Sequence, residues 1–202
     1  MRLLLVTAPT LEPVTLAQAR AHCRVTHTGD DDLLTELIVV AREAVESFVG
    51  RALVHRTYDL KSDGFPCEWT LPMAPASSVT SITYVDTDGT TQTLAADQYA
   101  TILAGGTPGC DAGRIVPAYG VVWPATRGTP EDVTVRFVAG YGAAASDVPS
   151  VFKHAIKVMV EDLYEERGSY VTGTIVTALP TAVERLLMPY RTALTLVGAK
   201  ED

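Results

Sequence analysis

The chain has 202 residues, of which 47% are hydrophobic and 20% charged, enough apolar side chains for one core, with or without a small additional lobe. Sixteen basic against 24 acidic side chains give a formal net charge of -8; without clustered Lys and Arg, this excludes a protein that holds nucleic acid mainly through its phosphates. Three cysteines without a CxxC pattern indicate neither a disulfide framework nor a structural zinc site. No stretch approaches the roughly 20 apolar residues of a membrane span, so we expect a soluble chain.

Two helices are predicted near the start of the chain. Thr15 and Gln18 have the spacing of a capping box, which predicts a short helix over about residues 16–25. The aspartates at 30–32 favour the start of a second helix, because carboxylates stabilise the positive end of a helix dipole, and Gly50 is a suitable terminator. The apolar positions of this second helix follow helical spacing; they are Leu33, Leu34, Leu37, Ile38, Ala41, Ala44, Val45 and Phe48.

The middle of the chain changes to a period of two, which is typical of strands. Between the predicted strands, Asp88 and Gly89 supply the positive-φ residues that a tight hairpin turn needs, and residues 105–128 are rich in turn formers. Residues 3–6 are expected to form a short strand or an extended arm. The other expected strands are residues 54–61, 69–71, 79–85, 90–94 and 131–139.

Helical spacing returns in the last third of the chain. Asp147 and Pro149 indicate the start of a helix that ends near Arg167. Another helix is expected after Pro180 and stops early, at Pro189. The apolar face of the first of these helices is Phe152, Ala155, Ile156, Met159, Leu163 and Tyr164.

The predicted fold class is therefore α+β. We expect two N-terminal and two C-terminal helices to form one helical bundle, because neither pair can bury its apolar face alone. A small antiparallel β lobe is inserted between them. The expected boundaries are 1–52 for the N-terminal helices, 53–140 for the β lobe and 141–202 for the C-terminal helices and tail.

The sequence carries no pattern typical of catalysis, metal binding or cofactor binding. The four histidines have neither HxH nor HExxH spacing. The carboxylates of residues 161–166 lie opposite an apolar stripe and are interpreted as a solvated face that could also meet Arg or Lys of a neighbouring subunit. The glycine-rich residues 105–109 lack the GK[ST] ending of a phosphate loop. An enzyme whose site forms only in three dimensions remains the alternative.

One segment between the last two helices suggests a partner. Residues 168–179 are β-prone and nearly uncharged, and their apolar side chains would stay exposed on a bare monomer. They are covered either by a neighbouring chain or by the chain's own bundle. The residues of this segment that we assign to a tentative interface are Tyr170, Val171, Ile175 and Val176.

Several phrases, in order, resemble one known family. They are PVTLAQARAH (13–22), DDLL (31–34), GRAL (50–53), TYDL (57–60), GFP (64–66), VTSITYVD (79–86), YG (119–120), WP (123–124), VTVRF (133–137) and AGYG (139–142). Together they resemble the phage head–tail connector (adaptor or head-completion) family, in its longer form with a β insert. Each phrase alone is only a cap, a turn or a strand, so the order and spacing carry the resemblance, from about Pro13 to Arg191.

The resemblance implies a structural, non-enzymatic protein of the virion neck. Such proteins form a ring, typically a dodecamer, joining the portal to the next neck, stopper or tail protein. Genomic DNA passes through their lumen without sequence-specific binding, and assembly takes place in the host cytoplasm. Relatives commonly dock on the portal through the region matching residues 180–202. The tentative interface therefore also includes Leu187, Tyr190, Arg191, Leu194 and Leu196.

Two other functions remain open from the sequence. One is a tail-completion or stopper-type neck protein, in which β structure would dominate. The other is a small enzyme or ligand-binding module with an unrecognised site. The acidic charge either keeps the chain in solution or suits a conduit through which DNA slides.

Overall fold

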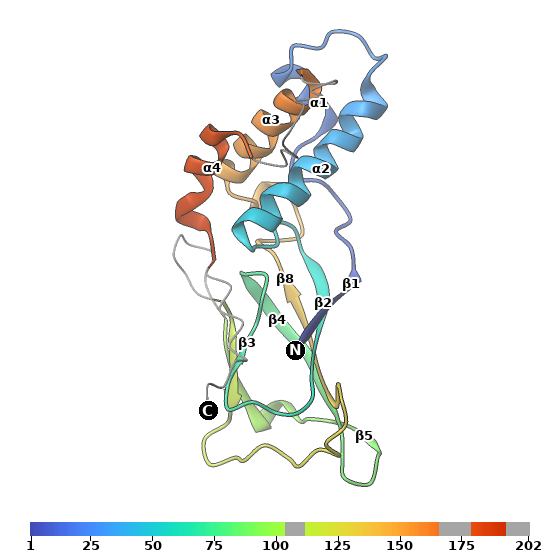
Figure 1. The fold of residues 1–202 in the computed structure, drawn as a ribbon, viewed down its shortest axis with the longest axis vertical. Helices are drawn as coiled ribbons and strands as arrows, with labels where there is room; N and C mark the ends of the chain where they lie inside the picture. Colours follow the sequence, from blue (N-terminus) through green and yellow to red (C-terminus); the bar gives the residue numbers. More distant parts are fainter. Residues whose placement is uncertain (104–111, 166–178, 193–202) are drawn as a thin grey trace, which may run out of the picture.

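The computed structural model describes residues 1–103, 112–165 and 179–192. A layer of helices lies at one end of the elongated molecule and antiparallel strands form the other end (Figure 1). This arrangement confirms the α+β fold class. Within the described ranges, no helix is both long and apolar enough to cross a membrane.

Helix α1 (Leu16–His22) begins at the predicted residue and ends three residues before the predicted end, whereas α2 (Asp31–Val49) begins and ends where its sequence signals lie. The capping box is formed, because Thr15 Oγ1 accepts from the Gln18 N–H at 3.3 Å and Gln18 Oε1 accepts from the Thr15 N–H at 3.1 Å. Gly50 ends α2 in the left-handed region, at φ 66°. Asp30 precedes α2 without a side-chain cap bond; its carboxylate instead accepts a 2.6 Å hydrogen bond from the Tyr164 hydroxyl.

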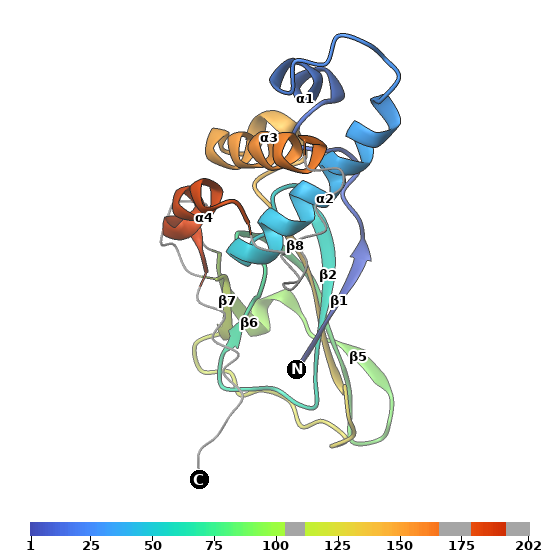
Figure 2. The same cartoon turned by 45° about the horizontal axis from the view of Figure 1, so that its top comes forward.

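Helix α3 (Ser150–Glu165) is the middle of the helical layer and packs against α1, α2 and α4 (Thr181–Leu187) (Figures 1 and 2). A 3-10 turn, Met188–Tyr190, follows α4. The helices share one apolar core, because their buried stripes face α3. Its fully buried members include Leu34, Ile38, Val45, Leu53, Phe152, Ile156, Val183 and Leu187.

The strands form two sheets. The larger has the order β1-β2-β8-β4-β5 and is antiparallel throughout. Its strands are β1 (Arg2–Thr7), β2 (Arg56–Ser62), β8 (Val133–Ala139), β4 (Ala76–Val85) and β5 (Thr91–Thr93). The smaller sheet has the order β3-β7-β6, with strands β3 (Trp69–Thr70), β7 (Arg114–Pro117) and β6 (Tyr99–Ile102). Side chains of both sheets form a second apolar core, which includes Trp69, Leu71, Ile82, Ile115, Val135 and Phe137.

Most expected strands are present, and the predicted β4–β5 hairpin has the register Thr83↔Thr93. Gly89 takes φ 85° in its turn. The sequence interpretation was wrong for residues 114–117, which lie in the turn-rich stretch and form β7, and it missed β6. Both strands are only four residues long, so their alternation was too short to distinguish from a loop.

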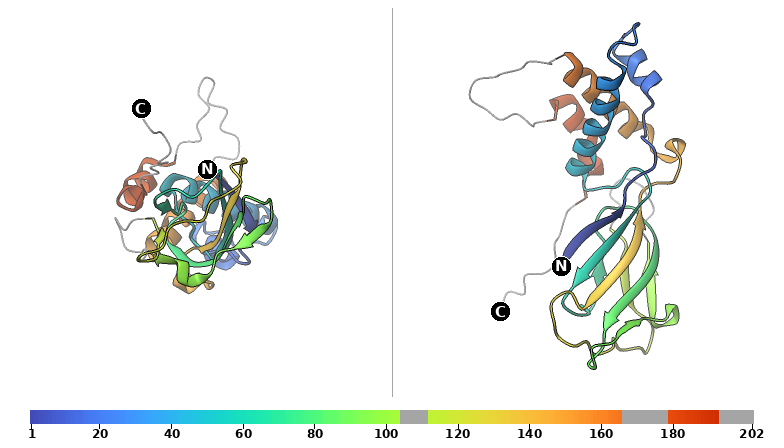
Figure 3. Two further views of the ribbon diagram at one scale, coloured as in Figure 1. Left: turned by 90° about the horizontal axis from the view of Figure 1, so that it is seen from below. Right: turned by 90° about the vertical axis from the view of Figure 1, so that its right-hand side faces the viewer.

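The N-terminal residues join the β part of the molecule. Residues 2–7, grouped by sequence with the first helices, form β1 and pair with β2 in the register Leu3↔Leu60. The chain then crosses to α1 and returns through α2 (Figure 3, right). The chain therefore passes between the strands and the helices three times: from β1 to α1, from α2 to β2 and from β8 to α3.

Candidate functional site

The tentative interface residues fall into two groups. Six of them lie outside the described residues: Tyr170, Val171, Ile175, Val176, Leu194 and Leu196. The other three, Leu187, Tyr190 and Arg191, lie at the end of α4 and in the turn that follows it. The candidate site is therefore this C-terminal segment, residues 187–192.

Leu187 is part of the helical core and is not on the surface. Its exposed fraction is 0%, and it packs in the same core as Val183 and Phe152. The apolar spacing of α4 predicts this equally well, since Val183 and Leu187 are one helical turn apart. As a correction to the sequence interpretation, the Leu187 side chain is a core residue of this chain and has no surface to offer a partner.

Tyr190 is half-buried and anchored on both its ring and its main chain. Its ring packs edge-on against Phe152, with centroids 5.2 Å apart, and Phe152 also contacts Tyr141 at 5.5 Å. Its carbonyl oxygen accepts a 2.6 Å hydrogen bond from Arg51 Nε. The Arg51 side chain is only 1% exposed, so a buried guanidinium holds the end of the C-terminal segment. Burial raises the pKa of Tyr141, although Arg51 opposes this.

Arg191 and Thr192 attach the segment to the end of α2. The Arg191 guanidinium carbon lies 5.4 Å from the centre of the Phe48 ring, a cation–π contact. The Thr192 N–H donates to the Val49 carbonyl at 2.8 Å, and its hydroxyl donates to the same oxygen at 3.1 Å. Val49 ends α2, where carbonyls lack intrahelical donors. These contacts attach Arg191 and Thr192 to the last turn of α2.

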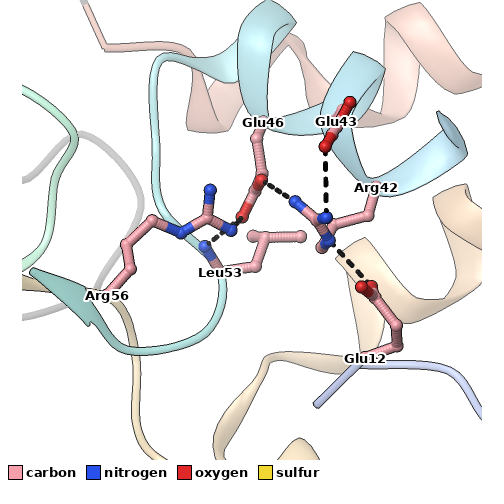
Figure 4. A network of polar contacts seen from close by, with 6 residues as sticks. All are labelled: Glu12, Arg42, Glu43, Glu46, Leu53 and Arg56. Carbon is pink, nitrogen blue, oxygen red and sulfur yellow. Dashed lines mark hydrogen bonds and ion pairs between the residues drawn. The ribbon is translucent and has the colours of Figure 1, made fainter. Parts of the chain in front are cut away.

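A buried network of charges joins α2 to β2 (Figure 4). One oxygen of Glu46 accepts from the Leu53 N–H at 2.8 Å and from Arg56 Nη2 at 2.6 Å. The other accepts from Arg42 Nη1 at 2.7 Å, and Arg42 Nε donates to Glu12 at 2.7 Å. Burial alone would lower the pKa of Arg42, but the bonds and charges of Glu12 and Glu46 outweigh it and raise that pKa. The network fixes the first helices on the strand that follows them.

The sequence contained signals for this joint that were not recognised. Arg56 occupies a position on the buried side of the predicted alternation, beside Tyr58 and Leu60. Arg42 and Glu46 have the i, i+4 spacing of a helical ion pair. No signal in the sequence indicated that Arg51 would contact Tyr190. Arg51 follows α2 and Tyr190 follows α4, and the two residues are 139 positions apart in the chain.

The Glu46 carboxylate and the His22 ring are both engaged in contacts within the chain. Both Glu46 oxygens already accept from donors, which leaves little room for acid–base work at that carboxylate. His22 Nε2 lies 3.2 Å from Glu161, and its ring meets that of His154 at 6.2 Å. Among the residues that the structure describes, no group of three or more His, Cys, Asp or Glu could hold a metal ion.

Comparison with known proteins points to one class. Residues 13–85 match the model described as "Phage gp6-like head-tail connector protein". This range contains α1, α2, β2, β3 and β4, together with Glu46 and its partners Arg42 and Arg56. The match confirms the resemblance stated from the sequence. No curated protein matches the chain. The class to which these residues are similar is that of head–tail connector proteins.

Solved particle structures contain similar chains. One is from the neck of an empty gene transfer agent (GTA) particle computed with C6 symmetry, with 28% identity and a TM-score of 0.76. Another is from the virion of a native GTA particle, with 28% identity and a TM-score of 0.73. A third is from the neck of a native GTA particle computed with C12 symmetry, with 26% identity and a TM-score of 0.73. Each comparison covers 98% of this chain and 99% of the other.

Proposed function

We propose that this chain is a connector subunit that forms a ring of identical copies in the neck of a phage or phage-like particle. The observation that carries the proposal is the similarity to GTA neck chains over nearly the full length of both chains. A similar fold along the whole length supports a similar place in the particle. The C12 and C6 symmetries of those necks support a cyclic arrangement, and a dodecamer is the copy number that we propose.

The partners follow from a position in the neck. In the proposed ring, one face meets the portal and the other meets the next neck, stopper or tail protein. Genomic DNA passes through the lumen without sequence-specific binding. The net charge of -8 supports this, because a wall without clustered cations releases few counterions and holds phosphates weakly.

The proposed role is structural and involves no reaction. The half-buried Tyr190, held by Phe152 and Arg51, and the exposed Arg191, packed on Phe48 of α2, lie toward the C-terminal end of the chain. We propose that this end of the chain contributes to portal docking. We further propose that the helices from both ends of the chain act as one bundle, from which the β lobe of residues 53–140 projects. The protein assembles in the host cytoplasm and ends in the virion neck.

The proposal is tested in particles. Cells producing the particle with an affinity tag on the portal should yield portal complexes that contain this chain in a fixed ratio. Electron microscopy should show it as a ring below the portal. Deletion of the chain should leave filled heads without attached tails. Complete necks in the deletion strain would contradict the proposal, as would a chain that never purifies with particles.

A further inference from the structure

The helical layer has two outer ends, formed by different helices. Helix α3 packs against both α2 and α4; the start of α2 lies away from α4, whereas the end of α2 lies near it (Figures 1 and 2). A copy related by rotation about an axis would bring the α4 side of one molecule toward the α2 side of the next. Rings use such head-to-tail contacts, in which two different patches of the same protein meet.

The outer face of α4, taken together with the turn Met188–Tyr190 that follows it, carries apolar side chains, one cation and one exposed carboxylate, Glu184. Val183 and Leu187 point into the core, so the helical period places Arg185 on the opposite side. Met188 is 54% exposed, and Leu186 also lies at the surface. In the described part of the chain, Arg185 makes no ion pair.

The outer face of α2 is complementary. Val40 is the exposed large apolar residue of this helix, at 49%. Glu36 lies one turn before Val40 and Glu43 one turn after it, on the side of α2 that faces away from the core residues Ile38 and Val45. The Glu43 side chain is 65% exposed and makes only a 3.4 Å contact with Arg42. This face thus offers an apolar centre between two carboxylates.

We infer that the outer face of α4, with Arg185, Leu186 and Met188, binds the outer face of α2, with Glu36, Val40 and Glu43, on the neighbouring copy. The inference rests on the proposed ring and names the contact that closes it. Charge complementarity identifies the occupant as a second copy. Chains with a net charge of -8 repel one another, and a contact that pairs Arg185 with Glu36 or Glu43 locally reverses that repulsion. Each contact need only be weak, because every copy makes two of them around a closed ring.

A charge-swap experiment tests this contact. Arg185→Glu and Glu36→Lys/Glu43→Lys should each lower incorporation into portal-bound rings by at least about tenfold, because each places like charges opposite one another. The variant carrying all three substitutions should recover most of the incorporation. Arg24→Glu is the matched control: Arg24 is exposed at the end of α1, and this substitution changes the net charge by the same amount as Arg185→Glu. It should assemble as the unsubstituted chain does.

A cross-linking experiment tests the geometry independently. A chain with both Val40→Cys and Met188→Cys should form an oxidation-dependent ladder of covalent oligomers in assembled rings. Either substitution alone should not, which controls for the native cysteines. Rings that form normally with Arg185→Glu, and no ladder from the paired cysteines, would overturn the inference while leaving the proposed function intact. An unsubstituted chain that never joins the portal would instead contradict the proposed function.

Discussion

Arg51 Nε donates a 2.6 Å hydrogen bond to the carbonyl of Tyr190, which lies 139 positions further along the chain. The same guanidinium reaches the Tyr141 hydroxyl at 3.4 Å. Arg51 follows Gly50, the left-handed residue that ends α2, so the turn that terminates the helix also directs this side chain inward. One residue therefore ties the end of α2, the segment after β8 and the segment after α4 together.

Replacing Arg51 should loosen the C-terminal segment. Arg51→Met keeps much of the side-chain volume but removes the donors to Tyr190 and Tyr141. We expect a loss of about 1–3 kcal/mol in the free energy of unfolding, because buried acceptors are left without a partner. Urea unfolding followed by circular dichroism measures this. Arg24→Met, at an exposed arginine, should stay within about 0.5 kcal/mol; equal effects of both substitutions would contradict the role given to Arg51.

Neutralising Glu46 should destabilise the joint between α2 and β2. Glu46→Gln leaves the buried Arg42 and Arg56 without their shared carboxylate, and breaking one partner of a buried pair costs about 3–5 kcal/mol. Glu43→Gln on the same helix is the control, and its expected cost is under about 1 kcal/mol because that carboxylate is exposed. Thermal unfolding of both variants provides the measurement. A Glu46→Gln variant as stable as Glu43→Gln would show that the network contributes little.

Truncating Leu187 should lower the stability of the monomer, whereas truncating Leu186 should lower ring incorporation and leave the monomer stable. Leu187→Ala removes a fully buried side chain and should cost about 2–5 kcal/mol of monomer stability. Leu186→Ala lies at the surface and should cost less than about 0.5 kcal/mol, while ring incorporation should fall. Chemical unfolding of the isolated chain separates the two residues. A stable Leu187→Ala monomer would contradict the placement of Leu187 in the core.

Asp132 should contribute to stability at neutral pH and less in acid. Its carboxylate accepts from the Thr129 hydroxyl and from the Thr129 N–H, and these bonds lower its pKa below the ordinary value of 3.8. Since the folded state binds the proton more weakly than the unfolded state, the stabilisation is complete above the ordinary pKa and is lost as pH falls through the folded one.

The test of this pH dependence compares two asparagine variants. Unfolding of Asp132→Asn should show a shallower loss of stability below about pH 4 than the unsubstituted chain. Asp97→Asn, at an exposed carboxylate that accepts from the neighbouring Gln98, removes the same charge and controls for that loss; it should unfold as the unsubstituted chain does at neutral pH. Parallel pH profiles for Asp132→Asn and the unsubstituted chain would contradict the assignment.

The local signals of this sequence were sufficient for the helices and most strands. Thr15 with Gln18, and Gly50 at φ 66°, set the ends of helices through bonds and conformations within a few residues. The Asp88-Gly89 turn and the flanking alternation likewise determine the β4–β5 hairpin. Strands β6 and β7 were missed because each is short and finds its partner only in the smaller sheet.

By itself, the sequence determined the order of helices and strands, the α+β class and the resemblance to connectors, because capping, turn geometry and apolar period act between near neighbours. Only the tertiary structure decided that β1 completes the larger sheet and that Arg51 holds Tyr190. Those contacts connect residues far apart in the chain. Their partners are chosen by which surfaces bury together, and no spacing along the sequence records that choice.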